Sequence, residues 1–169
     1  TALRADSAHV AVTRANGVLA GLVEPSGGTI SGQAAIANFN GWAPREMAVV
    51  DPAALSVNIP RHIHRPLDSQ PRQSGPGGDN GDPNSRRKES LEALKQQFLK
   101  ARRYGEVVAE ARSRRLPAPK RDARMEALIP YARGEKLVIL HANDRVEILD
   151  ALTLARELKL KAAISGAAD

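Results

Sequence analysis

An uninterrupted apolar run that ends in a histidine is the feature that most constrains the fold. Residues 137–140 read Leu-Val-Ile-Leu, and His141 follows them directly. A continuous run, as opposed to an alternating one, is typical of a strand that helices cover on both faces. The next apolar run, 162–165, follows a single amphipathic stretch, and a crossover of this length favours parallel strands. The sequence therefore predicts a strand, a helix and a second strand, with His141 where the first strand ends.

The helix between these two runs has a clear beginning and one apolar face. Asp144 can accept hydrogen bonds from the free backbone amides of the first turn, and Gly134 is expected to end the helix that precedes the first strand. Apolar residues at three- and four-residue spacing form the face that we expect to pack on the sheet: Ile148, Leu149, Leu152, Ala155 and Leu158.

Periodicity and turn residues predict the remaining elements. Helices are expected over residues 6–16, 44–50, 90–112 and 122–133, and buried strands over 18–23 and 54–59. Four apolar strands separated by helices indicate an α/β fold. Because a closed (β/α)₈ barrel needs about 250 residues, we predict an incomplete barrel with about four parallel strands that alternate with helices.

The chain is expected to be one partial barrel, residues 1–169, with an insertion. Residues 60–85 are rich in Pro, Gly, Asp and Asn, and the part from Ser69 to Asn84 has no apolar anchor, so we expect a flexible surface segment there. The chain starts at Thr1 without a signal peptide and stops just after an apolar run. We therefore expect a segment of a longer protein, whose remaining part completes the barrel.

Composition limits the partners and the metal ligands. The sequence has no cysteine, so a metal would be held by histidine nitrogens and carboxylate oxygens. No apolar run approaches the roughly 20 residues of a membrane helix, which predicts no membrane partner.

The net charge of +6 comes from one stretch of the chain. Residues 86–124 contain 13 basic and 5 acidic side chains. A basic helix can bind phosphates, which leaves a nucleic-acid-binding module as one alternative. However, only 3% of the residues are aromatic, which leaves few side chains for stacking on bases. A solvated helix face is the favoured interpretation, and nucleic acid is disfavoured as a partner.

Three candidate site segments stand out. His62 and His64 have the spacing that places two imidazoles on one side of a strand, but arginines and prolines surround them, and whether they bind metal stays open. The small-residue segment 26–33 allows backbone amides to approach a ligand closely, or forms a tight turn. His141 has a rigid strand behind it, and from the residues alone it is either a metal ligand or a hydrogen-bonded structural histidine.

Several stretches resemble the metal-dependent amidohydrolase superfamily, in particular the bacterial imidazolonepropionase-like amidohydrolases. These stretches are residues 10–18, 24–33 and 137–143, together with Gly41-Trp42 and Glu46-Met47. The resemblance implies a (β/α)₈ barrel with one or two divalent ions, usually zinc, that activate water against an amide or cyclic amide. It also suggests export from the cell.

The resemblance assigns a role to His141, and location at the same mouth of the barrel suggests a role for five further residues. His141 matches a metal-binding histidine, while the residues expected to contact a small amide substrate are Ser26, Gly28, Ser31, Gln33 and Asn143. Related enzymes place another histidine ligand on the next strand, where this chain reads Ile164-Ser-Gly-Ala. A non-catalytic binding protein derived from a barrel therefore stays open as the alternative.

Overall fold

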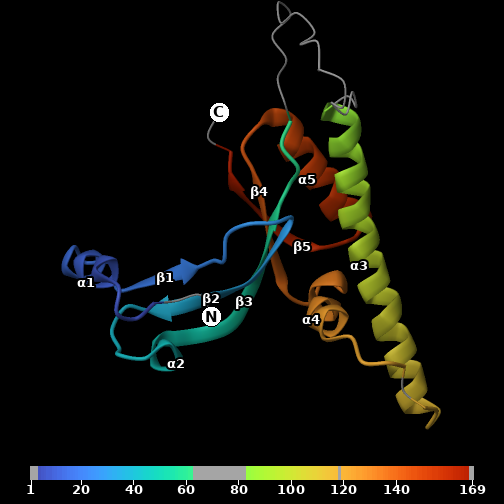
Figure 1. Ribbon diagram of the computed structural model, residues 1–169, viewed down its shortest axis with the longest axis horizontal. Helices are drawn as coiled ribbons and strands as arrows, with labels where there is room; N and C mark the ends of the chain where they lie inside the picture. The colour runs from blue at the N-terminus through green and yellow to red at the C-terminus, as the bar shows by residue number, and fades with distance from the viewer. Residues whose placement is uncertain (1–3, 63–82, 118, 168–169) are drawn as a thin grey trace, which may run out of the picture.

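The computed structural model describes residues 4–62, 83–117 and 119–167, and these residues form five strands and five helices (Figure 1). In chain order the elements are α1 (Ala8–Ala15), β1 (Ala20–Val23), β2 (Ile30–Asn38), α2 (Pro44–Met47), β3 (Ala48–Asn58), α3 (Pro83–Ser113), α4 (Ala123–Ala132), β4 (Leu137–Ala142), α5 (Arg145–Glu157) and β5 (Lys161–Gly166). None of the described helices is long and apolar enough to cross a membrane.

The strands form one mixed sheet in the order β1-β2-β3-β4-β5, which curves into half a barrel. β1 and β2 pair antiparallel, as do β2 and β3, whereas β3, β4 and β5 are parallel. The expected segment of four parallel strands alternating with helices is therefore wrong. Parallel neighbours require a long crossover, and the connections from β1 to β3 are short, so this part of the sheet is antiparallel.

The strand that the sequence did not predict is β2. Its sequence, Ile-Ser-Gly-Gln-Ala-Ala-Ile-Ala-Asn, has few of the β-branched and aromatic residues that are enriched in strands. Pairing with β1 and β3 overrides this weak local preference, and Ala34, Ala35 and Ala37 are buried. Segment 26–33 is thus a loop only as far as Thr29, and Ser31 and Gln33 lie in a strand.

The amino-terminal elements are far more exposed than expected. The predicted buried strand 18–23 is the short edge strand β1, in which Leu22 is 45% exposed. The structure describes every residue of α1, and none of them is buried. A strand at the edge of a sheet pairs on one side only, which explains why β1 stays open to solvent.

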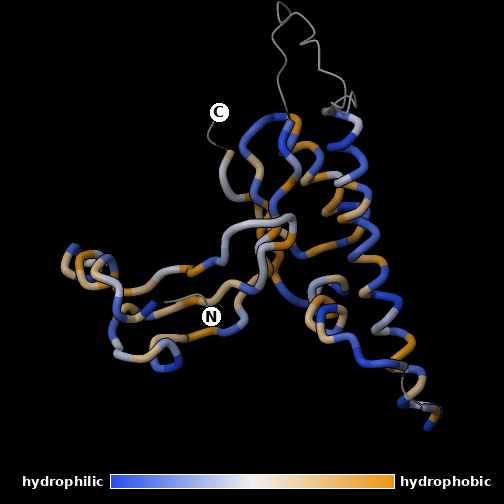
Figure 2. The backbone as a smooth tube through the Cα atoms, in the orientation of Figure 1, coloured by the Kyte–Doolittle hydropathy of each residue, from blue (hydrophilic) through white to orange (hydrophobic). Residues whose placement is uncertain are grey.

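The three longer helices cover one face of the sheet and form the main core with it. Figure 2 shows hydrophobic residues concentrated where these helices meet the strands. The core side chains of the sheet are Leu55, Val57, Ile59, Val138, Leu140 and Ala142. The side chains that α3, α4 and α5 pack against them include Leu94, Phe98, Leu128, Tyr131, Ala151 and Leu154.

The parallel half of the fold agrees with the sequence analysis. β4, α5 and β5 follow one another as predicted, and β4 is parallel to β5. Asp144 caps α5, accepting a hydrogen bond from the amide of Val146 at 2.8 Å. Helix α3 begins at Pro83, earlier than expected, and residues 63–82 of the predicted insertion lie outside the described residues.

Candidate functional site

His141 lies near the carboxyl end of β4, on the face of the sheet that the helices do not cover. It is opposite Asn58 of β3 and Ser165 of β5 in the strand register. Side chains alternate along a strand, so the buried Leu140 points toward the helices and His141 points away from them. The His141 side chain is 31% exposed. The imidazole is therefore held by a rigid strand and is still accessible from outside.

Two polar side chains meet His141 at the same nitrogen. The Nε2 atom lies 2.8 Å from Oε2 of Glu24 and 3.0 Å from Oγ of Ser56. Glu24 follows β1 directly, and Ser56 lies near the carboxyl end of β3. We call Glu24, Ser56 and His141 the His141 cluster. A carboxylate accepts hydrogen bonds and does not donate them, so the contact with Glu24 corresponds to the tautomer of His141 in which Nε2 carries the hydrogen.

The geometry of the His141 cluster does not fit a serine nucleophile. In a Ser-His-acid triad the serine and the carboxylate bind opposite nitrogens of the imidazole. Here both bind Nε2, and Ser56 is only 1% exposed. Ser56 consequently serves to position the imidazole of His141.

The donor atoms of the His141 cluster are of the kind that divalent metals use, but they are few. Zinc held by imidazole and carboxylate has bonds of about 2.0–2.2 Å, which places two tetrahedral ligand atoms about 3.3 Å apart. Nε2 and Oε2 would have to separate by roughly half an ångström from their 2.8 Å. Within residues 4–62, 83–117 and 119–167, no group of three His, Cys, Asp or Glu side chains is placed to hold a metal. His141 and Glu24 could therefore provide two ligands of a larger set.

In the second candidate histidine segment, His62 contacts residues at the start of α5. The backbone N–H of His62 donates to Oε1 of Glu147 at 2.9 Å, and its Nδ1 lies 3.8 Å from Oδ2 of Asp144. His64 lies outside the described residues. The metal role of this pair stays a prediction.

Two of the residues expected to contact substrate lie next to the His141 cluster. The side-chain amide of Asn58 donates to the carbonyl of Gly28 at 2.7 Å and to Oγ of Ser31 at 3.0 Å. The backbone N–H of Asn58 donates to the carbonyl of Thr29 at 2.8 Å. These bonds hold the loop after β1 and the start of β2 at the carboxyl end of β3, where Asn58 is opposite His141.

The other three expected substrate residues are placed differently. Ser26 is exposed in the same loop, and Asn143 follows β4, with its Oδ1 packed close to Gly166. Gln33 is opposite Leu55, whose side chain belongs to the core under the helices. The structure therefore does not bring Gln33 to the His141 cluster.

Sequence reasoning singled out His141 but missed Glu24 and Ser56. Glu24 did carry a signal, because it is a carboxylate directly after a predicted strand and before a small-residue loop. Ser56 carried none, since it is one small polar residue inside an apolar run. Its role depends on the register that places β3 beside β4.

A buried carboxylate supports the loop that follows His141. Glu147 is 5% exposed, and besides His62 it accepts hydrogen bonds from the backbone N–H groups of Asn143 at 3.0 Å and Asp144 at 3.4 Å. Burial acts to raise the pKa of Glu147, but these three backbone donors outweigh it, and the net pKa is lowered. Glu147 therefore fastens the start of α5 to the segment after β3.

The variant Glu147→Gln should lower the free energy of unfolding by about 2 kcal/mol at pH 7, because it removes charge-assisted hydrogen bonds. A lowered folded-state pKa means that the carboxylate stabilises the protein fully above the unfolded pKa. This contribution disappears as the pH falls through the folded pKa, so the difference between wild type and variant should shrink below about pH 4.3. Urea unfolding at several pH values measures it. The control Glu89→Gln, an exposed change on α3, should leave the free energy of unfolding at pH 7 nearly unchanged.

Comparisons with known proteins support the fold. No family model matches the sequence, and no curated protein matches it at a significant level. Among solved structures, an amidohydrolase from Thermotoga maritima MSB8 matches 88% of this chain with a TM-score of 0.65 and 19% sequence identity. The chain spans 36% of the length of that structure. At this level of identity the likeness concerns the fold, and this chain therefore folds like part of an amidohydrolase structure.

Proposed function

We propose that the chain supplies part of the active site of a metal-dependent hydrolase that cleaves amide or cyclic-amide C–N bonds. The observation that carries the proposal is the convergence of His141 Nε2 and Glu24 Oε2 at the carboxyl end of parallel strands. In barrel enzymes this end of the strands holds the chemistry. The fold shared with part of an amidohydrolase supports the same reaction class.

In this proposal, His141 and Glu24 are two ligands of a divalent ion, with zinc as the first choice. A bound ion of this kind lowers the pKa of a coordinated water to about 7 and polarises the carbonyl of the substrate. The described residues provide two candidate ligands, so we place the remaining ligands outside them, with the rest of a barrel as partner. The experiment below also tests the alternative that His141 is a hydrogen-bonded structural histidine that binds no metal.

The other residues of the site bind and orient. Ser56 holds the imidazole of His141 from the buried side, which fixes the direction of Nε2. Asn58 anchors the loop after β1 and the start of β2, which present the backbone of Gly28 and the hydroxyl of Ser31 to a small amide substrate. Asn143 is the third substrate contact that we propose, from the loop after β4. A metal at Nε2 would require the tautomer of His141 that carries its hydrogen on Nδ1.

Titration of the protein that carries the complete barrel with Co²⁺, a spectroscopic substitute for zinc, tests this proposal. We expect saturable binding that weakens at least tenfold in His141→Ala and in Glu24→Gln. The matched control is His9→Ala, which removes an exposed imidazole from α1 and should leave the affinity unchanged. Equal effects of His141→Ala and His9→Ala would contradict the ligand assignment. Metal binding without any amide hydrolysis in the protein carrying the complete barrel would favour the non-catalytic binding protein.

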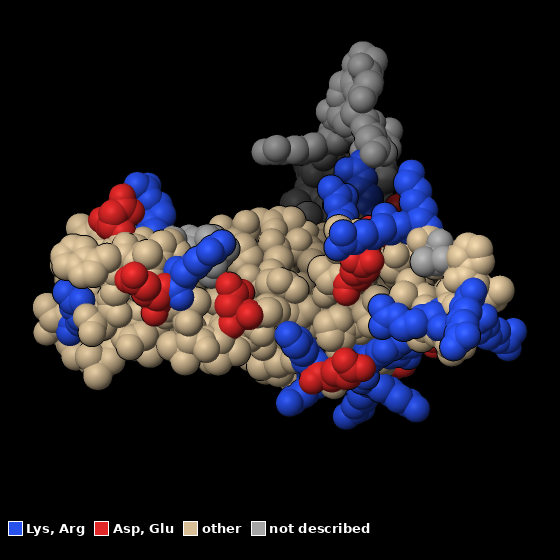
Figure 3. Space-filling view, turned by 90° about the horizontal axis from the view of Figure 1, so that it is seen from below, with Lys and Arg blue, Asp and Glu red and all other residues tan. Residues whose placement is uncertain are grey.

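The nucleic-acid alternative has less support, because part of the basic stretch makes contacts inside the molecule. Arg87 pairs with Asp150, Lys95 lies 2.7 Å from Glu157, and Arg102 donates to backbone carbonyls. Figure 3 shows the larger group of Lys and Arg side chains at the right of the view, on the side of α3 and α4, with acidic side chains among them. We therefore do not propose nucleic acid as a partner.

A further inference from the structure

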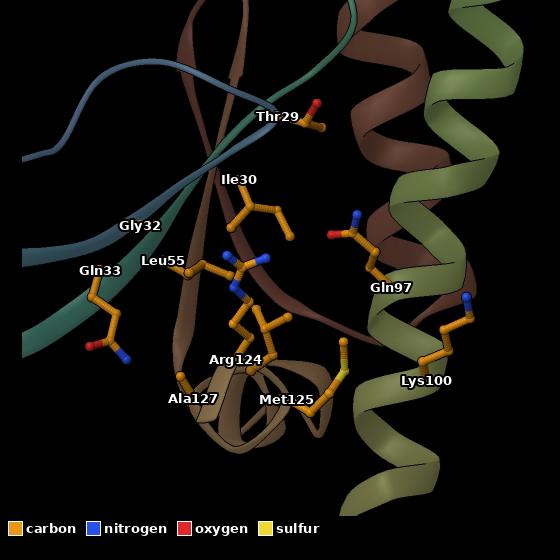
Figure 4. Close-up of a pocket in the computed structure, with 11 residues that line it drawn as sticks. Thr29, Ile30, Gly32, Gln33, Leu55, Gln97, Lys100, Arg124, Met125 and Ala127 are labelled. Atoms are coloured by element: carbon orange, nitrogen blue, oxygen red, sulfur yellow. The ribbon is translucent and has the colours of Figure 1, made fainter. Parts of the chain in front are cut away.

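A groove separates the helix-facing side of the β2–β3 pair from helices α3 and α4 (Figure 4). Its volume of about 700 Å³ falls within the range of small-molecule sites, roughly 300–1,000 Å³. Leu55 lines the groove, whereas its neighbour Ser56 points to the opposite face of the sheet and binds His141. The groove is therefore distinct from the His141 cluster.

Part of the wall of the groove is apolar. Its hydrophobic side chains are Ile30, Leu55, Met125 and Leu128, and they come from a strand pair on one side and a helix on the other. Ile30 and Met125 belong to the partly buried layer that packs against the main core. An aliphatic chain placed there would be removed from water, which is the usual basis of binding in such sites.

The charged residues of the groove are all positive. The described lining residues include Arg124 and Lys100 and no acidic side chain. In Figure 4 the guanidinium of Arg124 extends from α4 toward Ile30 and Leu55, and the amide of Gln97 projects from α3 into the same space.

The guanidinium of Arg124 has no counter-ion in the part of the chain that the structure describes. The nearby carboxylate of Glu126 binds Arg121 instead, at 3.0 Å. Arg124 thus brings an unpaired positive charge and up to five N–H donors to an apolar surface. An anionic group bound there would satisfy those donors and compensate the charge.

We propose that this groove binds a small organic anion, namely a carboxylate attached to an aliphatic chain. The planar guanidinium of Arg124 matches a carboxylate, which accepts two parallel hydrogen bonds from it. Gln97 donates a further hydrogen bond through its side-chain amide, and Lys100 adds positive charge at the α3 edge. The aliphatic chain lies against Ile30, Leu55 and Met125. The proposal does not depend on the function proposed for His141.

NMR titration of the chain with octanoate tests the proposal. We expect saturable shifts at the groove residues Leu55, Met125 and Ala127. Octanol has the same chain without charge and should bind at least tenfold more weakly, and acetate should not saturate the site. Tighter binding of octyl phosphate than of octanoate would overturn the choice of a carboxylate.

Two arginine substitutions, each of which removes one positive charge, test where the anion binds. Arg124→Gln should weaken octanoate binding at least tenfold, whereas Arg103→Gln, which removes an exposed arginine of α3 outside the groove, should change it less than twofold. Ala127→Leu should also weaken binding, because it fills the groove from an exposed helix position. Equal effects of the two arginine variants, shifts confined to other surfaces, or a dimer that closes the groove would each overturn the proposal.

Discussion

Replacing Arg102 with methionine should lower the free energy of unfolding by about 3 kcal/mol, because this α3 side chain donates hydrogen bonds to backbone carbonyls at the C-terminal ends of α4 and α5. The Nε of Arg102 donates to the carbonyl of Ala132, the last residue of α4, at 3.1 Å, and Nη2 donates to the carbonyl of Leu158 after α5 at 2.6 Å. Hydrogen bonds from charged donors contribute about 1.5–3 kcal/mol each. Methionine preserves much of the side-chain volume, so the loss reports the bonds.

The matched control for this change is the next residue along the helix. Arg103 is exposed and has no hydrogen bond or ion pair with the residues that the structure describes, so Arg103→Met should change the free energy of unfolding by less than about 0.5 kcal/mol. Urea unfolding of both variants at pH 7 measures the difference. Equal stabilities of the two variants would show that Arg102 does not join α3 to the ends of α4 and α5.

The parallel half of the fold was predictable because its signals are local. The run 137–140, the cap at Asp144 and the helical spacing that follows all lie within about thirty residues, and together they indicate a strand followed by a helix. The structure confirms β4, α5 and β5 in this order. The position of His141 at the strand end follows from the same pattern.

The antiparallel half was not predictable because its strands depend on partners. The alanines and the glycine of β2 have little preference for a strand, and the segment reads as a loop until its pairing with β1 and β3 is known. Missing β2 also led to the wrong sheet, because three strands connected by short links must run antiparallel.

In the candidate site, too, local sequence signals predicted one residue, and residues brought together by the fold were missed. His141 was found from its own strand, but Glu24 and Ser56 reach it from 117 and 85 residues away in the sequence. Gln33 was grouped with the site because its segment was read as a loop. As a strand residue opposite Leu55, it lies on the helix side of the sheet.

The two ends of the parallel strands therefore differ in what they do. The carboxyl ends carry His141 and the loops around it, while the amino ends are fixed by Arg102 and by the turn at Gly134. Gly134 has a φ of +73°, and a Cβ atom there would lie 2.7 Å from the carbonyl oxygen of Lys159 in the turn before β5. In barrel folds the amino-terminal face of the strands contributes stability.

Gly134→Ala should consequently destabilise the protein by about 3 kcal/mol, from two separable causes. A left-handed backbone costs a residue with Cβ about 1–2 kcal/mol, and the clash with Lys159 adds the rest because a backbone carbonyl must move. Gly28 provides the matched control, since its φ is +69° but its Cβ would meet no atom closer than 3.8 Å. Gly28→Ala should therefore lose only about 1–2 kcal/mol in urea unfolding. Equal losses in the two variants would mean that the turns before β4 and β5 do not pack as tightly as the structure has them.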